Sequence, residues 1–168
     1  MQSRIGFSSA TAARLAGITY RQLDHWTRVN VVVPSIEPAA GYGSKRRWNF
    51  VDIVGLRVLR ELLGEGLSMQ RVRCILPVLR SFTGESHNLR ALAQARLVVL
   101  PAGEVAVLAD RNTLIELFPN SGQAVISSIV VELRPALIEV QRAMKTEKLA
   151  NEVNALKAAG AWILEDAA

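Results

Sequence analysis

A sharp corner between two helices is the sequence feature that most constrains this fold. It lies in LAGITYRQLDHW, residues 15–26 of a 168-residue chain. Residues 10–16 are good helix formers, and Gly17 follows where a left-handed residue would end that helix. Thr19 and Gln22 fit the S/T-x-x-E/Q capping box, so a second helix is expected to begin at Thr19. This is the pattern of a helix-turn-helix, although two ordinary packed helices can meet in the same way.

The second helix is expected to have one buried and one exposed face. Leu23 and Trp26 lie three residues apart and share a face, which we assign to the core. The side chains left on the outward side are Tyr20, Arg21, Asp24, His25 and Arg28.

A basic, glycine-containing segment follows this helix. Residues 31–34 (VVVP) and 45–48 (KRRW) can form two short extended arms around the flexible turn at 38–44 (PAAGYGS). Such arms, with three consecutive cations beside the tip, indicate a β-wing. A run of charges is usually only a solvated surface. Here the nearby glycines and the flanking Tyr42 and Trp48 favour a loop that contacts phosphates.

Positive charge is concentrated in the first half of the chain. Residues 1–90 hold 13 Lys and Arg against 6 Asp and Glu, a net charge of +7, whereas residues 91–168 hold 7 against 9, a net charge of −2. A basic half suits a polyanionic partner such as nucleic acid. Charge alone fits a small basic domain of another kind equally well.

Further helices are expected after the wing. Apolar residues recur at helical spacing over 51–64 and again over 72–79, where Ser68 can cap the helix. These elements complete a predicted DNA-binding domain at residues 1–80, and residues 81–95 are expected to be a linker.

The second half is expected to combine short strands with a long terminal helix. A hairpin is predicted from 96–100 and 105–108, a short helix at 113–118, and a strand at 125–133 for which a helix is the alternative. Residues 96–133 would form a small α/β segment for an effector or a partner. One long amphipathic helix is expected from Pro135 to Ala159, within a segment 134–168, and its spare apolar face would meet a second copy of the chain.

Patterns for catalysis, metal binding and membrane insertion are missing from the sequence. His25 and His87 have no partners for a triad, and no phosphate-binding or dinucleotide-binding glycine motif is present. The single cysteine, Cys74, excludes an internal disulfide and a Cys-rich zinc site, and we expect it to be a semi-buried thiol. No apolar run approaches the ~18 residues of a membrane helix. We therefore expect a cytoplasmic protein that is not an enzyme and has no cofactor or metal.

The order of elements over residues 7–80 resembles the MerR family of winged helix-turn-helix transcriptional regulators. The matching positions are Phe7, Ala13, Leu15, Gly17, Ile18, Leu23 and Trp26, the wing at 43–48, and Gly66, Leu67, Ser68, Val72 and Ile75. Asp24, His25 and Thr27 depart from the family's arginine, tyrosine and acid. The chain is most similar to an actinobacterial branch that lacks metal-sensing cysteines. The implied fold is mainly α with small β elements (α+β), ending in a dimerisation helix.

The resemblance implies a homodimer that binds duplex DNA at a promoter or operator. Such dimers underwind an overlong promoter spacer so that RNA polymerase can use it; the resemblance implies no particular small-molecule effector. The recognition helix would be residues 19–29 and the wing residues 41–48. Two other readings stay open. One is a protein-interaction module, such as an antitoxin or adaptor, that uses residues 91–168. The other is a DNA-architectural or recombination-directionality factor with the same winged domain.

DNA binding would divide the exposed residues into three roles. Phosphates need cations, whereas sequence is read at base edges. Arg21 is the candidate for a base-edge contact, with a phosphate contact as the alternative. Asp24 would repel phosphate, so it is expected to hold Arg21 or Arg28 in place. The expected backbone contacts are Tyr20, His25 and Arg28 on the helix and Lys45, Arg46 and Arg47 on the wing, while Tyr42 would touch a sugar edge or pack the wing down.

Overall fold

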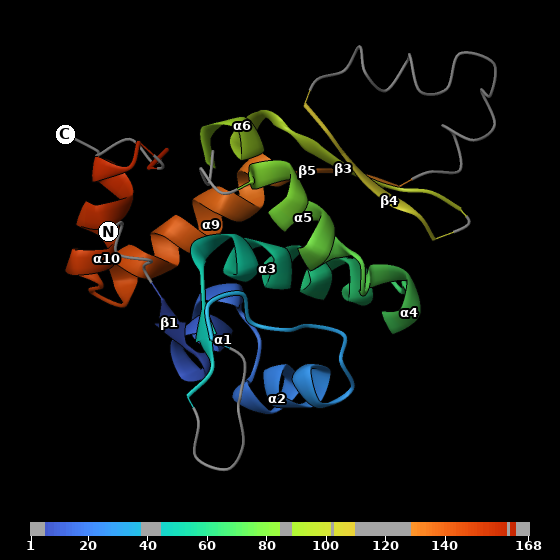
Figure 1. The fold of residues 1–168 in the computed structure, drawn as a ribbon, viewed down its shortest axis with the longest axis horizontal. Helices are drawn as coiled ribbons and strands as arrows, with labels where there is room; N and C mark the ends of the chain where they lie inside the picture. The colour runs from blue at the N-terminus through green and yellow to red at the C-terminus, as the bar shows by residue number, and fades with distance from the viewer. Residues whose placement is uncertain are drawn as a thin grey trace.

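The protein has the expected α+β fold, and its described residues are mainly helical with two small antiparallel sheets (Figure 1). The structure, a computed structural model, describes residues 6–37, 45–84, 89–101, 103–109, 129–160 and 162–163. The described helices are α1 (Ser9–Ala16), α2 (Tyr20–Arg28), α3 (Phe50–Gly64), α4 (Met69–Val72), α5 (Ile75–Thr83), α6 (Leu89–Gln94), α9 (Leu133–Thr146) and α10 (Ala150–Ala158). The described strands are β1 (Phe7–Ser8), β2 (Arg47–Trp48), β3 (Arg96–Val99), β4 (Val105–Leu108) and β5 (Ile129–Glu132).

The predicted corner between α1 and α2 is confirmed. Gly17 has φ 72° and ψ 31°, and it ends α1 in the left-handed region that glycine adopts without a steric penalty. Its N–H donates to the Arg14 carbonyl at 3.1 Å, and the Ile18 N–H donates to the Ala13 carbonyl at 3.0 Å. Thr19 then caps α2, and its capping box with Gln22 is complete. Local backbone chemistry therefore sets the angle at which α2 leaves α1.

Helix α3 is the centre of the molecule and packs against α1, α5 and α9 (Figure 1). Asn49 caps α3 in a second capping box with Asp52. The single helix predicted after Ser68 is instead two helices, α4 and α5, and Ser68 makes no side-chain cap bond. The predicted linker at 81–95 is also partly helical. Residues 81–83 continue α5, and α6 buries Leu92 completely.

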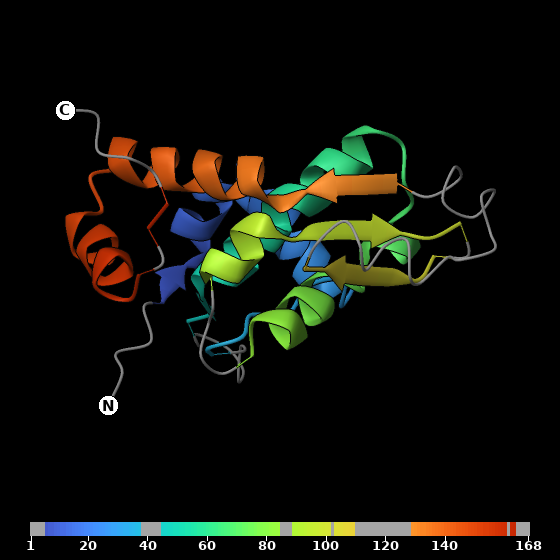
Figure 2. The same ribbon diagram turned by 90° about the horizontal axis from the view of Figure 1, so that it is seen from above.

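A three-stranded antiparallel sheet follows, in the order β4-β3-β5 (Figure 2). The predicted hairpin is confirmed as β3 and β4, with Leu97 opposite Val107. Residues 129–132 are a strand rather than a helix, and β5 pairs with β3 so that Val131 lies opposite Leu97 on its other side. The helix predicted at 113–118 lies outside the described residues.

The prediction of a single long C-terminal helix is wrong, because α9 and α10 are separate helices. Lys148 adopts φ 55° after the end of α9, and the Leu149 N–H returns to the Met144 carbonyl at 3.2 Å. This hydrogen-bonding pattern ends α9 without a glycine, and hence without the usual signal in the sequence. Leu137, Val140 and Met144 are fully buried on α9, which packs against α1, α3 and α6. The apolar face that suggested a dimer helix is thus covered within the chain, and one core joins both halves.

Candidate DNA-binding surface

Helix α2 presents a polar face that is open to solvent. Leu23 and Trp26 are buried, with 1% and 6% of their surface exposed, as the spacing predicted. On the other side Tyr20 is 57% exposed, and Arg21, His25 and Arg28 are also exposed. Among the described residues, no hydrogen bond or ion pair engages the Arg21 side chain. Its guanidinium lies on the exposed face of α2.

The described residues at the base of the wing, 35–37 and 45–48, are arranged differently from the expected pair of arms. Strand β2 pairs with β1, with Phe7 opposite Trp48 and Ser8 opposite Arg47. Residues 31–33 are not a strand, because the N–H groups of Val31 and Val32 donate to the Trp26 carbonyl at the end of α2. The bridge on the α2 side is formed instead by Glu37, which lies outside the predicted arm 31–34 and pairs with Arg47 at an isolated β-bridge.

The wing cations differ in their surroundings. Lys45 is exposed, whereas Arg46 is half-buried. Arg47 is exposed, and its Nη2 donates to the Gly6 carbonyl at 2.8 Å. Tyr42, with the rest of 41–44, lies outside the described residues. The structure therefore places three of the four predicted wing contacts, all of them cations.

Asp24 joins α2 to Arg46, next to strand β2. Its Oδ1 accepts from Arg46 Nη1 at 2.9 Å, and its Oδ2 lies 2.8 Å from Arg28 Nη2. The expected partnership of Asp24 with Arg28 is therefore present, and the alternative with Arg21 is not. The contact with Arg46 was missed, because no local spacing connects residues 22 positions apart in the chain.

The same contacts stabilise the ionised form of Asp24. The hydrogen bond from Arg46 lowers the pKa of the Asp24 carboxyl; partial desolvation opposes the shift, and the charges of Arg28 and Arg46 reinforce it. The stability that this pairing contributes is present above the ordinary pKa of aspartate and is lost as the pH falls through the lowered value. Asp24 is therefore negative at neutral pH. The set Arg21, Asp24, Arg28, Lys45, Arg46 and Arg47 then carries five positive charges and one negative, a net charge of +4.

Other kinds of site find less support in the described part of the chain. No group of three His, Cys, Asp or Glu residues there could hold a metal ion. Cys74 is exposed, which corrects the expected semi-buried thiol: it stands in the break between α4 and α5, outside the apolar face. Among the described helices, none is long and apolar enough to cross a membrane.

Comparison with known proteins points to the same segment. Residues 7–79 match the family described as MerR HTH family regulatory protein. The chain is also 46% identical over 76 residues to the uncharacterized HTH-type transcriptional regulators Mb1861 of Mycobacterium bovis and Rv1830 of Mycobacterium tuberculosis. Each match covers 45% of this chain and 34% of the relative, so the chain spans about a third of the length of these relatives. The similarity thus concerns the helix-turn-helix half.

Proposed function

Residues 7–79 belong to the MerR family of helix-turn-helix regulatory proteins, and on this premise we propose that the chain is a sequence-specific, DNA-binding transcriptional regulator. The observation that carries the proposal is the cationic surface formed by α2 and the wing base, with Asp24 tying Arg46 to the helix. Duplex DNA attracts such a surface through its phosphates, and an exposed helix can enter the major groove. The relatives' printed name, HTH-type transcriptional regulator, agrees with this function.

In this proposal the exposed side chains keep distinct roles. Arg21 contacts a base edge, where its guanidinium can bridge two acceptors of a guanine. The wing residues Lys45, Arg46 and Arg47 contact phosphates. The remaining backbone contacts are Tyr20, His25 and Arg28, and Tyr42 lies at a sugar edge.

We further propose a homodimer that binds two half-sites, distorts promoter DNA and acts together with RNA polymerase in the cytoplasm. Two-fold symmetric operators need two recognition helices at a fixed spacing. Because the apolar face of α9 is buried within the chain, this dimer must use a surface other than the one that Leu137, Val140 and Met144 occupy. Light scattering at several concentrations tests the dimer directly.

The double variant Arg21→Ala/Arg46→Ala tests the proposed function. We expect it to remain folded and to bind duplex DNA about 10- to 100-fold more weakly, since it loses a base contact and a phosphate contact. The measurement is a mobility shift on the duplex that the parent protein enriches from a random-sequence pool. Arg134→Ala/Arg142→Ala removes the same charge from exposed positions on α9 and is the control. Equal mobility shifts for the first variant and the parent would contradict the proposal.

A second variant, Asp24→Asn, separates affinity from specificity. It removes the one negative charge of the surface and the ionic partner of Arg28 and Arg46. We expect tighter binding to a shuffled duplex and a fall of about two- to five-fold in the ratio of specific to non-specific binding, because a partly exposed ion pair contributes modestly. Titrations of both duplexes with fluorescence anisotropy measure that ratio. A ratio equal to the parent's would rule out a positioning role for Asp24.

A further inference from the structure

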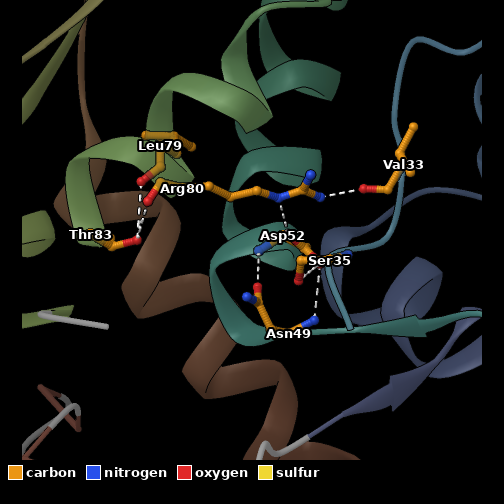
Figure 3. A network of polar contacts seen from close by, with 7 residues as sticks. All are labelled: Val33, Ser35, Asn49, Asp52, Leu79, Arg80 and Thr83. Carbon is orange, nitrogen blue, oxygen red and sulfur yellow. Dashed lines mark hydrogen bonds and ion pairs between the residues drawn. The ribbon is translucent and has the colours of Figure 1, made fainter. Parts of the chain in front are cut away.

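A buried carboxylate, that of Asp52, lies at the start of α3 and faces Ser35 and Arg80 (Figure 3). Asp52 is fully buried, and its Oδ2 accepts from the Ser35 N–H at 3.0 Å, the Ser35 hydroxyl at 2.6 Å and the Asn49 N–H at 3.1 Å. Its Oδ1 accepts from Arg80 Nε at 2.8 Å. A buried charge is retained only where it is paired and hydrogen-bonded, and these four donors meet that condition.

The guanidinium of Arg80 reaches two segments at once. While Nε binds Asp52, Nη2 donates to the carbonyl of Val33 (Figure 3). Val33 and Ser35 belong to the stretch that leaves α2 and continues to Glu37, which bridges to Arg47 on β2. Arg80 therefore fixes the segment that connects α2 to the wing base, through Val33 directly and through Ser35 by way of Asp52.

Arg80 lies on α5, a helix that packs against elements other than α2. Helix α5 packs against α3, against strand β4 and against α6. The side chain of Arg80 is 27% exposed and reaches back from α5 toward the wing base. The position of the wing base relative to α2 therefore depends on how α5 packs between α3 and the sheet.

We infer that Arg80 is a positioning residue for DNA binding, which sets the wing base against α2 through Val33 and Asp52 without touching DNA. The inference rests on the proposed function. It follows from the fork of the guanidinium, since one planar group with several donors can hold a carboxylate and a carbonyl together. A lysine at this position keeps the charge opposite Asp52 but offers one compact ammonium in place of the fork.

The test compares Arg80→Lys with the parent protein on the duplex that the parent enriches from a random-sequence pool. We expect about five-fold weaker binding, the loss of roughly one hydrogen bond that orders the wing. Because Asp52 is fully buried whereas Glu132 is 61% exposed, the melting temperature should fall more than in the control Arg96→Lys, which alters the ion pair with Glu132, and binding is measured well below both melting temperatures. Ser35→Ala is the second variant, because it removes one link between the wing base and Asp52 while Arg80 stays in place.

A double-mutant cycle distinguishes positioning from general destabilisation. A Lys45→Ala/Arg46→Ala background keeps only Arg47 of the three proposed phosphate contacts of the wing, so Arg80→Lys should weaken binding less there than in the parent. Full affinity in Arg80→Lys would overturn the inference whatever the result for Ser35→Ala, as would the same loss in both backgrounds. A parent protein that enriches no sequence would overturn the proposed function and the inference with it. A parent that binds while Arg80→Lys binds equally overturns the role of Arg80 alone.

Discussion

Trp48→Ala is expected to destabilise the folded protein by about 3–5 kcal/mol, the range for removal of a large aromatic side chain from a core. Trp48 lies on β2 with 0% of its surface exposed, and its Nε1 donates to the Ser9 hydroxyl at 3.0 Å. It therefore joins the wing base to the start of α1 and to the core. Since domains of this size are stable by only about 5–15 kcal/mol, the variant should be visibly less stable.

Urea denaturation followed by circular dichroism measures this effect, with Trp48→Phe as the matched control. Phenylalanine keeps most of the apolar volume and loses the N–H that Ser9 accepts. We expect Trp48→Phe to fall between the parent and Trp48→Ala. A Trp48→Ala protein within about 1 kcal/mol of the parent would show that the β1–β2 pair contributes little to the fold.

The parts of the site that sequence could predict are those set by neighbours along the chain. Gly17 ends α1, Thr19 and Gln22 cap α2, and the spacing of Leu23 and Trp26 defines its buried face. Each of these features depends on hydrogen bonds or contacts within one or two turns of helix. The exposed face of α2 followed directly from them.

The wing base depends on partners that are distant in sequence, and there the prediction was right for the strand within 45–48 but wrong for 31–34. Strand β2 could pair with Phe7–Ser8 or with residues 31–33. It pairs with Phe7–Ser8, because the N–H groups of residues 31 and 32 already donate to the Trp26 carbonyl. The Asp52–Arg80 pair connects residues 28 positions apart, which no local pattern reveals. The segment after α2 and helix α5, which look independent in sequence, are therefore coupled by the buried carboxylate of Asp52.

The C-terminal helices illustrate a different limit of sequence reasoning. Apolar residues recur in steps of three or four over 137–144 and again over 149–156, and the prediction of one helix passed over the step of five between Met144 and Leu149, where the helices separate. The break is made by Lys148 in a left-handed conformation, and Glu147 beside it pairs with Arg14 of α1 at 3.0 Å. A contact with the first helix thus accompanies the turn. The packing of α9 on α1, α3 and α6 buries the face that would otherwise suggest a second copy.

The second large effect is the dependence of DNA binding on salt. The proposed surface carries a net charge of +4 in each protomer, so a dimer would place about eight charges on DNA. Each neutralised phosphate releases counterions, which favours binding most at low ionic strength. Asp24 belongs in this sum, because its lowered pKa keeps it ionised at neutral pH.

For a dimer we expect log K to fall with log salt with a slope of about −7, or about 10⁴-fold between about 50 and 200 mM salt. One protomer bound alone should give a slope of about −4 and a loss of roughly 10²-fold. Anisotropy titrations over a salt series measure the slope, and Lys45→Ala should reduce it by about one for each protomer bound. Arg142→Ala, on the exposed side of α9, is the control and should leave it unchanged. A slope near zero would exclude phosphate contacts by this surface, and a slope that only Arg142→Ala reduces would place DNA on α9 instead.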